Sequence, residues 1–267
     1  MKPRAILIDL FGDHLRYHGG EAKLQVLSEL LLDFGVGEST ARVVLSRMRR
    51  DGWFVTRREG RETVYALTEH SWQVFDEGRE RIFERTLDPW DGSWRMVIYA
   101  VPEAARAERE RIRRTLAWHG FGPLASATWV SPHDRLDEVE AALADSSATR
   151  LDLLTCRSRG RAADVEMAGR CWDLDGLGRD YEKLVSRYEQ LPATADLARL
   201  PGDQALRLRI ELVAEYRGFP FRDPDLPPEL LPEGWLGSRA HELFVAAHDA
   251  LREPAEAHVR EVLERSR

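Results

Sequence analysis

Seven arginines gather in one short stretch of this sequence, against only two acidic residues, Asp51 and Glu59. They are Arg42, Arg47, Arg49, Arg50, Arg57, Arg58 and Arg61. A guanidinium is a planar fork of N–H donors that matches the oxygens of a phosphate and the edge of a guanine. A single surface arginine is usually just a solvated side chain, and the whole chain has a net charge of −7. The local excess of cations nevertheless predicts a surface that meets phosphate groups, because only the facing surface must be basic.

A helix predicted from about Ser39 to Arg50 gives several of these arginines a common face. Ser39 suits the N-cap, and Gly52 supplies the left-handed residue that ends the helix. One side of the helix is apolar and consists of Ala41, Val44, Leu45 and Met48. The opposite side carries Ser39, Val43, Ser46 and Arg50, flanked by Arg42 and Arg47. This pattern predicts a buried stripe and an outward basic face.

Two further helices and a hairpin surround the basic helix. Helices are predicted over 3–15 and 22–34, and Gly35-Val36-Gly37 turns the chain into the basic helix. Strands over 53–57 and 62–67 are joined by the connection Arg58-Glu59-Gly60-Arg61. Three helices and a hairpin predict a winged helix-turn-helix that binds double-stranded DNA. The side chains expected there are Val43, Ser46 and Arg50 toward base edges, Arg42 and Arg47 toward phosphate or guanine, Arg57, Arg58 and Arg61 on the wing, and Ser39 at the helix start.

The length of the chain, 267 residues, suits three modules and predicts an α+β multidomain protein. Residues 1–87 form the winged helix-turn-helix domain, and turn-forming residues at 88–92 mark a linker. Residues 90–160 run in β-α-β-β-α-β order, which predicts a ferredoxin-like domain with two helices on one face of its sheet. The other face is left uncovered, which predicts a homodimer. Residues 161–267 are mostly helical and form a candidate effector-binding domain.

Short motifs extend along nearly the whole chain. They are Leu10-Phe11-Gly12-Asp13, Arg16, Gly19-Gly20, residues 42–53, Tyr65-Ala66-Leu67-Thr68, Trp90-Asp91-Gly92-Ser93-Trp94, Tyr216-Arg217-Gly218-Phe219-Pro220-Phe221-Arg222-Asp223-Pro224, Leu230-Leu231-Pro232 and Trp235. Together they resemble the phenylacetic acid degradation repressors, the PaaX family. The resemblance implies a GntR-like winged helix, a central domain related to the Cas2 nucleases and a helical C-terminal domain. It also implies repression of an aromatic catabolic operon, released by an aryl-coenzyme A thioester.

Three residues of the last module are candidates to hold such an anionic, aromatic effector: Arg217, Arg222 and Trp235. A guanidinium pairs with phosphate, and an indole stacks on an aromatic ring. The alternative is structural packing around the Pro-rich stretch at 220–232, which is the commoner role for such residues. The expected partners are thus an inverted-repeat operator, a small-molecule effector and a second copy of the chain.

The alternative function is a nucleic-acid-processing enzyme that uses the Cas2-like domain. The Cas2 pattern has an aspartate near the end of its first strand, where this sequence has Tyr99-Ala100-Val101-Pro102, so a metal-dependent active site is not expected. A nonspecific architectural DNA-binding protein is a further alternative. The acidic remainder of the chain disfavours it, because such proteins depend on extensive phosphate neutralisation.

No catalytic residue, metal site or cofactor is predicted elsewhere. The acids Asp9, Asp13, Glu103, Glu108 and Asp134 fit no ligand spacing, and we interpret them as solvated or capping residues. The two cysteines, Cys156 and Cys171, are expected to be reduced and buried. No apolar run reaches the roughly 18 residues that span a bilayer, so no membrane partner is expected and the protein is predicted to be cytoplasmic.

Overall fold

A computed structural model describes residues 1–84, 89–148 and 150–266. The described residues form two compact units. The first contains residues 1–84, 184–218 and 238–266, and the second contains 89–148, 150–183 and 219–237. The predicted end of the DNA-binding segment, residue 87, lies outside the described residues. None of the described helices combines the length and the apolar character needed to cross a membrane.

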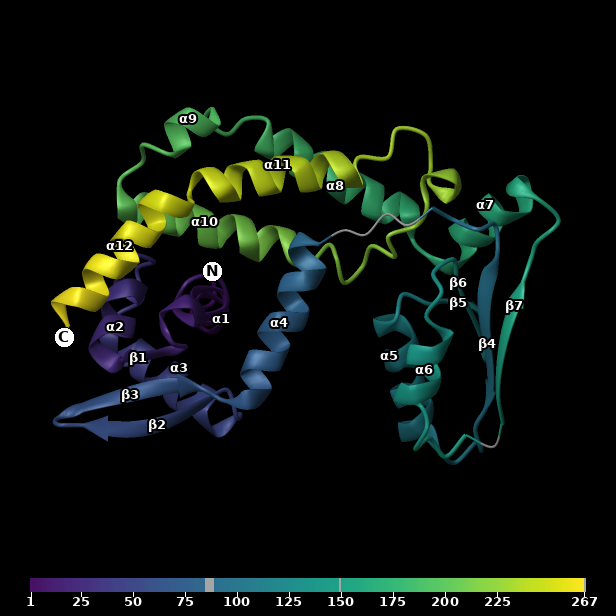
Figure 1. Cartoon of the computed structure of the whole chain (residues 1–267), viewed down its shortest axis with the longest axis horizontal. Helices are drawn as coiled ribbons and strands as arrows, with labels where there is room; N and C mark the ends of the chain where they lie inside the picture. The colour runs from purple at the N-terminus through teal and green to yellow at the C-terminus, as the bar shows by residue number, and fades with distance from the viewer. Residues whose placement is uncertain (85–88, 149, 267) are drawn as a thin grey trace. The chain divides into compact units, whose positions relative to one another are not determined.

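The N-terminal part of the first unit packs helices against a small sheet (Figure 1). Its elements are α1 (Pro3–Asp13), the 3-10 helix η1 (Leu15–His18), β1 (Glu21–Lys23), α2 (Leu24–Leu32), α3 (Glu38–Arg50), β2 (Phe54–Glu59), β3 (Glu62–Leu67) and α4 (Glu69–Phe83). The core lies between the first three α-helices and includes Leu10, Leu27 and Leu45, all with no exposed surface. Burial of such large aliphatic side chains supplies most of the stability of a small helical assembly.

Helix α3 has the predicted apolar stripe but a different first residue. Ala41, Leu45 and Met48 are fully buried, whereas Val44 is only half-buried. The prediction of Ser39 as the N-cap is wrong, since the helix begins at Glu38 and Gly37 takes the extended N-cap conformation without a side-chain hydrogen bond. Ser39 is therefore an exposed residue of the first helical turn. The predicted stop is confirmed, because Gly52 has a φ of 82°.

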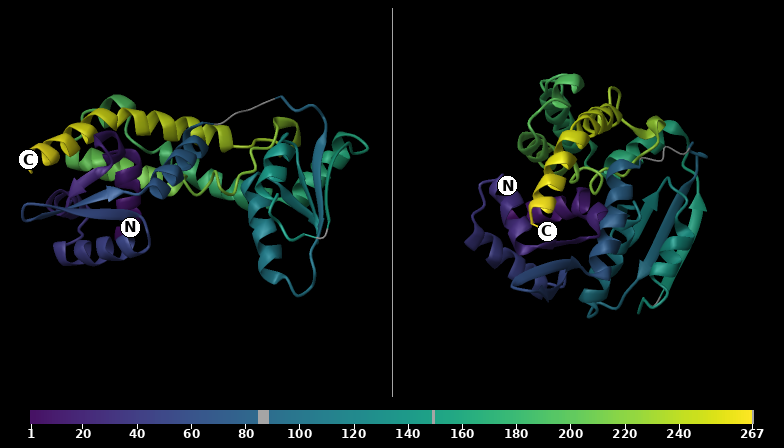
Figure 2. Two further views of the ribbon diagram at one scale, coloured as in Figure 1. Left: turned by 60° about the horizontal axis from the view of Figure 1, so that its bottom comes forward. Right: turned by 60° about the vertical axis from the view of Figure 1, so that its left-hand side comes forward.

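The sheet of this unit has the strand order β1-β3-β2, with every pairing antiparallel. Strands β2 and β3 pair from Phe54↔Leu67 to Glu59↔Glu62. Their connection is therefore the two residues Gly60 and Arg61, shorter than the predicted four. The second helix was predicted to begin at residue 22. The chain instead forms strand β1, which pairs with β3, and α2 begins only at Leu24. The hairpin projects from the helices of this unit (Figures 1 and 2).

The C-terminal residues are helical, as predicted, and most of their helices belong to the first unit. These are α9 (Thr194–Leu197), α10 (Gly202–Tyr216), α11 (Gly237–Ala250) and α12 (Arg252–Arg265), while α8 (Leu174–Tyr188) contributes residues to both units. Helix α10 packs on α1, and α12 packs on α2. In the second contact Arg265 pairs with Glu29 at 3.1 Å. The C-terminal helices and the predicted DNA-binding elements thus share one compact unit.

The second unit contains a four-stranded antiparallel sheet with the strand order β5-β6-β4-β7. Its elements are β4 (Trp94–Ala100), α5 (Arg106–Trp118), β5 (Gly122–Ala125), β6 (Thr128–Ser131), α6 (Leu136–Ala142), β7 (Arg150–Cys156), α7 (Arg161–Cys171) and η2 (Pro228–Leu230). Helices α5 and α6 lie on the same side of the sheet (Figure 1). Ile112 of α5 and Val139 of α6 pack there against Val97 and Trp129.

The opposite face of this sheet is not wholly uncovered, contrary to the prediction. Trp94 and Val130 on that face pack in a cluster with Ala168 of α7 and Leu230 of η2. Trp94 Nε1 also donates a 2.7 Å hydrogen bond to Asp164 of α7. Helix α7 and the 3-10 helix η2, which follow the sheet in sequence, thus cover the part of this face around Trp94. Their packing buries a large apolar side chain that would otherwise be exposed. Farther along, Leu154 of β7 is 44% exposed.

The two cysteines are free thiols. Cys171 is buried as predicted, and burial raises the pKa of its thiol to about 11. Cys156 is only half-buried, so the prediction that both are buried is wrong for this residue. Its position at the end of the edge strand β7 explains the difference, because one side of an edge strand has no neighbour.

Candidate nucleic-acid interface

The outward face of α3 carries the side chains that were predicted to contact DNA. Ser39, Arg42, Arg47 and Arg50 are exposed, and Val43 is 69% exposed. Ser46 is half-buried. The helix turns this face away from the core because the opposite stripe of Ala41, Leu45 and Met48 has no exposed surface. An apolar side chain as exposed as Val43 on a basic helix suits contact with a thymine methyl group.

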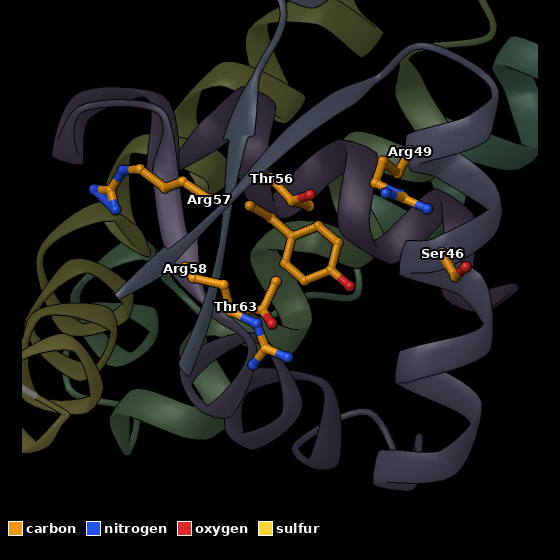
Figure 3. Close-up of a pocket in the computed structure, with 7 residues that line it drawn as sticks. Ser46, Arg49, Thr56, Arg57, Arg58 and Thr63 are labelled. Atoms are coloured by element: carbon orange, nitrogen blue, oxygen red, sulfur yellow. The ribbon is translucent and has the colours of Figure 1, made fainter. Parts of the chain in front are cut away.

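An open pocket of about 280 Å³ lies between α3 and the hairpin. It is lined by Ser46 and Arg49 of α3, by Thr56, Arg57 and Arg58 of β2, and by Thr63 and Tyr65 of β3. In Figure 3 the Arg57 side chain extends away from Ser46 and Arg49. The register explains the rest of the lining: Thr56 pairs with Tyr65 and Arg58 with Thr63, so these four side chains share one face of the hairpin.

The arginines of this surface differ in whether an acid neutralises them. Arg42 Nε donates to Glu38 Oε1 at 3.1 Å. Arg57 pairs with Glu59 at 3.0 Å and with Glu21 at 2.5 Å. Among the described residues, Arg58 pairs with no acid, and its Nη1 donates to the Arg61 carbonyl at 3.2 Å. Of the seven arginines on this surface, five have no acidic partner among the described residues: Arg47, Arg49, Arg50, Arg58 and Arg61.

Polar contacts fix the end of α3 to the start of the hairpin. Arg4 of α1 pairs with Asp51 just after α3 and lies over the Trp53 ring at 5.8 Å. Thr68 Oγ1 donates to the Gly52 carbonyl at 2.8 Å, and Ser71 Oγ donates to the Trp53 carbonyl at 2.8 Å. The Trp53 carbonyl also accepts a hydrogen bond from the backbone N–H of Thr68 at 3.3 Å. The helix face and the hairpin are therefore held in one geometry.

Sequence reasoning missed four lining residues of the pocket: Arg49, Thr56, Thr63 and Tyr65. Arg49 was counted among the cations but not placed at the site. The available signal was its spacing, because Arg49 lies three residues after Ser46 and hence on a neighbouring part of the same face. The strand alternation that places Thr56 beside Arg58, and Thr63 beside Tyr65, was the signal for the others.

The three candidate effector residues do not belong to one unit. Arg217 lies in the first unit, where its Nε is 3.3 Å from Asp9 Oδ1. Arg222 and Trp235 lie in the second. There Arg222 donates to Asp180 at 2.9 Å, and Trp235 contacts the Tyr181 ring edge to face at 5.6 Å. The role of these residues in effector binding stays a prediction.

The interpretation of Asp9 and Asp13 as solvated or capping residues is wrong. Asp9 is 4% exposed, and burial raises the pKa of its carboxyl to about 7, although the charge of Arg217 opposes the rise. Asp13 contacts Arg209 and His248. Burial alone would raise its pKa, but the hydrogen bond and charge of His248, with the charges of His14 and Arg209, hold it below the ordinary value. Both acids thus contact residues near the C-terminus that are far from them in the sequence.

Of the other acids, Glu103 is exposed, whereas Asp134 and Glu108 have structural contacts. Asp134 accepts a 2.8 Å hydrogen bond from Arg95, and Glu108 accepts a 2.7 Å hydrogen bond from Ser146. Over residues 1–84, 89–148 and 150–266, no three side chains of histidine, cysteine, aspartate or glutamate come together in a way that could hold a metal ion. Strand β4 ends at Ala100, without a carboxylate.

A basic helix face beside a basic hairpin has the chemistry of a nucleic-acid-binding surface. Three family models match the chain: "PaaX-like protein" over residues 2–71, "PaaX protein central Cas2-like domain" over 87–168 and "PaaX-like protein C-terminal domain" over 172–261. The chain therefore belongs to the PaaX family.

Two individual proteins are similar to this chain over nearly its whole length. "Transcriptional repressor PaaX" of Escherichia coli (strain K12) is 29% identical over 266 residues, which cover 96% of this chain and 83% of that protein. The solved structure of "Uncharacterized protein Rv0674 from Mycobacterium tuberculosis" has a TM-score of 0.65 and 26% identity, and the match covers 98% of this chain and 99% of that one. Both similarities extend across all three matched segments.

Proposed function

We propose that this protein is a transcriptional repressor that binds a specific DNA sequence. The observation that carries the proposal is the outward face of α3, where Arg47 and Arg50 have no acidic partner among the described residues and flank the exposed Val43. Membership of the PaaX family and similarity to a protein named a transcriptional repressor support it.

In this proposal the helices α1 to α3 and the sheet β1-β3-β2 act as a winged helix-turn-helix. Helix α3 enters the major groove and the hairpin lies over the neighbouring backbone. Val43, Ser46 and Arg50 face base edges, and Arg47 faces a phosphate or a guanine. Arg58 and Arg61 supply the free charge of the hairpin. Arg42 and Arg57 contribute less to the electrostatic attraction for DNA, because each already pairs with an acid.

The protein acts as a homodimer on an inverted repeat. Two symmetry-related α3 helices reach successive major grooves when they lie about 34 Å apart, which is one turn of B-DNA. A closed dimer with two-fold symmetry matches the symmetry of such a site. The exposed part of the sheet face around Leu154 offers apolar surface for this association.

An aryl-coenzyme A thioester releases the repressor from an aromatic catabolic operon. This step follows from the family resemblance. Arg217, Arg222 and Trp235 are the candidate contacts. The effector need not contact α3. It lowers operator affinity if it holds the two DNA-binding units of the dimer at a separation that does not match the two half-sites, because both half-sites must be bound together.

Selection from a random duplex library tests the proposal. The full-length protein is incubated with the library, bound duplexes are recovered and sequenced, and the enriched sequence is assayed by fluorescence anisotropy. We expect an inverted repeat that binds at least about 1,000-fold more tightly than random duplex, the usual lower range for specific DNA-binding proteins. No enriched sequence, or equal affinity for selected and random duplexes, would remove sequence-specific repression.

A further inference from the structure

The pocket between α3 and the hairpin is lined only by groups that can donate hydrogen bonds or carry positive charge. Its seven lining residues include three arginines, and the other four carry hydroxyl groups: Ser46, Thr56, Thr63 and Tyr65. No acidic side chain is among them. Arginine, serine, threonine and tyrosine are the side chains that proteins use to contact the phosphate oxygens of nucleic acids. The composition therefore selects an anion with several acceptor oxygens.

Two of the three arginines have charge available to such an anion. Arg57 is committed to Glu21 and Glu59, and its side chain extends away from Ser46 and Arg49 (Figure 3). Arg49 has no acidic partner among the residues that the structure describes, and Arg58 uses one N–H for the Arg61 carbonyl. A guanidinium has five N–H donors, so Arg58 keeps the others for a ligand. The two free charges come from opposite walls, one from α3 and one from β2.

The size of the pocket favours a group carried by a larger molecule. Pockets that enclose a whole drug-sized ligand usually measure about 300–1,000 Å³. This pocket measures about 280 Å³ and is open. It also adjoins the outward face of α3 through Ser46. A double-stranded DNA whose major groove receives α3 carries its phosphate backbone along both sides of that helix.

We propose that this pocket seats one phosphate group of the DNA backbone, gripped by Arg49 from the helix and Arg58 from the hairpin, with hydroxyl groups of Thr56, Thr63 and Tyr65 as further donors. The assignment rests on the proposed DNA-binding function and adds Arg49 to it. It fixes the register of α3 along the groove, because a phosphate contact positions a protein without reading sequence. Arg57 borders the same pocket, but its ion pairs with Glu21 and Glu59 leave it the smaller contribution to binding.

The first test compares Arg49→Ala with Arg57→Ala in the full chain. Each substitution removes one positive charge, so a difference between them reports direct contact and not net charge. Anisotropy is measured on the selected operator and on a random duplex at several salt concentrations. We expect Arg49→Ala to weaken both complexes about tenfold and to make the salt slope shallower by about one unit, while Arg57→Ala changes affinity less than about threefold. Circular dichroism spectra check that both variants fold.

The second test locates the phosphate. Uncharged methylphosphonate linkages replace single phosphates of the operator, one position at a time. We expect one position in each half-site where the neutral linkage weakens the native protein about tenfold and weakens Arg49→Ala clearly less, because only Arg58 and the hydroxyl groups remain in the variant to contact that phosphate. If every position weakens the variant as much as the native protein, Arg49 contacts no phosphate and the pocket assignment fails.

A third measurement separates DNA phosphate from a free anion. Inorganic phosphate is titrated calorimetrically into the DNA-free protein. We expect no binding below millimolar concentration, because the DNA supplies the rest of the binding energy. Submillimolar binding that Arg49→Ala abolishes would make the pocket a site for a free anion and overturn the assignment.

The failures of the two proposals can be distinguished. A native protein that binds neither duplex removes the DNA-binding function together with the pocket assignment. A native protein that binds the operator while Arg49→Ala and Arg57→Ala lose affinity equally removes the pocket assignment alone.

Discussion

Asp13 of α1 and Arg209 of α10 form a buried ion pair with two hydrogen bonds, although 196 residues separate them in the sequence. Arg209 Nε donates to one carboxylate oxygen at 2.7 Å, and Nη2 donates to the other at 3.0 Å. Arg209 is 3% exposed, and its Nη1 donates to the carbonyl of His248. His248 Nε2 completes the group at 3.0 Å from Asp13 Oδ1. One carboxylate thus joins α1 to two C-terminal helices, α10 and α11.

Replacing Asp13 with Asn should lower the free energy of unfolding by about 3–5 kcal/mol, because it leaves the Arg209 charge buried without a partner. The measurement is urea unfolding followed by circular dichroism. The double variant Asp13→Leu with Arg209→Met removes both charges and should be less destabilised than Asp13→Asn.

An exposed ion pair provides the control. The side chains of Arg199 and Asp196 are 79% and 65% exposed, and Arg199→Met, which breaks their contact, should cost less than about 1 kcal/mol. Equal losses for the buried and exposed pairs would contradict the role of Asp13.

Asp9 should make the stability of the fold depend on pH. Its carboxyl has a pKa of about 7 in the folded chain against an ordinary value of 3.8, with burial as the main cause. The folded state therefore holds this proton more tightly than the unfolded state. The contribution of the protonated group to stability is complete below about pH 4 and is lost as the pH rises through about 7.

The variant Asp9→Asn has no proton to lose, so its stability relative to the native protein should increase between pH 5 and pH 8. We expect a gain of more than about 1.4 kcal/mol, the equivalent of one pKa unit. Urea unfolding at the two pH values measures it. A stability difference that stays constant with pH would show that Asp9 titrates near its ordinary value.

Gly20 should tolerate alanine less well than Gly60. Both have a positive φ, 71° and 59°. A Cβ at Gly20 would lie 2.3 Å from the Trp72 ring, whereas a Cβ at Gly60 meets no atom within 4 Å. The left-handed backbone costs an alanine about 1–2 kcal/mol at either position. The clash should add about 1–3 kcal/mol to Gly20→Ala alone. Thermal unfolding of the two variants gives the difference, and equal melting temperatures would show that Trp72 moves aside without cost.

Periodicity predicted the parts of the fold that depend on neighbours along the chain. The stripe of Ala41, Leu45 and Met48 followed from helical spacing, and Gly52 followed from its freedom to adopt a positive φ. The first residue of α3 could not be predicted, because Glu38 and Ser39 both suit the first turn of a helix. Strand β1, with three residues, is too short to show an alternating pattern and forms because β3 offers it hydrogen-bond partners.

Contacts between distant segments could not be predicted from the same patterns. Asp13 belongs to the motif Leu10-Phe11-Gly12-Asp13 and to the acids that fit no ligand spacing, and nothing near it in sequence indicates Arg209. The acidic partners of the arginines show the same difference between contacts that are close and contacts that are distant in the sequence. Glu38 lies four residues before Arg42, a spacing that predicts their ion pair. Glu21 pairs with Arg57 only because β1 and β2 lie on either side of β3.

The sheet of the second unit should provide the contact between two copies. Leu154 is 44% exposed on the edge strand β7, on the face opposite α5 and α6. Leu154→Arg should convert a dimer into a monomer, because it places a charge in the apolar contact without a partner. Light scattering at micromolar concentration measures the mass. The control Val55→Arg adds the same charge at a residue of the first unit that is 57% exposed and should leave the dimer intact. A native protein that is already monomeric would remove the dimer from the proposed function.

Arg50 should contribute mainly to the recognition of one DNA sequence over others. Its side chain is exposed and has no acidic partner among the described residues, and it lies opposite the buried stripe of α3. Arg50→Ala should therefore leave the unfolding curve unchanged. It should weaken operator binding by roughly 1–3 kcal/mol, the scale of one good base contact, and weaken binding to random duplex much less. Fluorescence anisotropy on both duplexes measures the two effects.

Arg58→Ala is the matched comparison, because it removes the same charge from the hairpin instead of the helix. An arginine that meets only phosphate acts on every sequence alike, so this variant should weaken operator and random duplex by similar factors and make the salt slope shallower by about one unit. The ratio of the two affinities then separates the roles: it should fall for Arg50→Ala and stay constant for Arg58→Ala. Unchanged operator affinity for Arg50→Ala would mean that another face of α3 meets the bases. A ratio that falls equally for both variants would place Arg58 at a base edge, in the minor groove beside the hairpin.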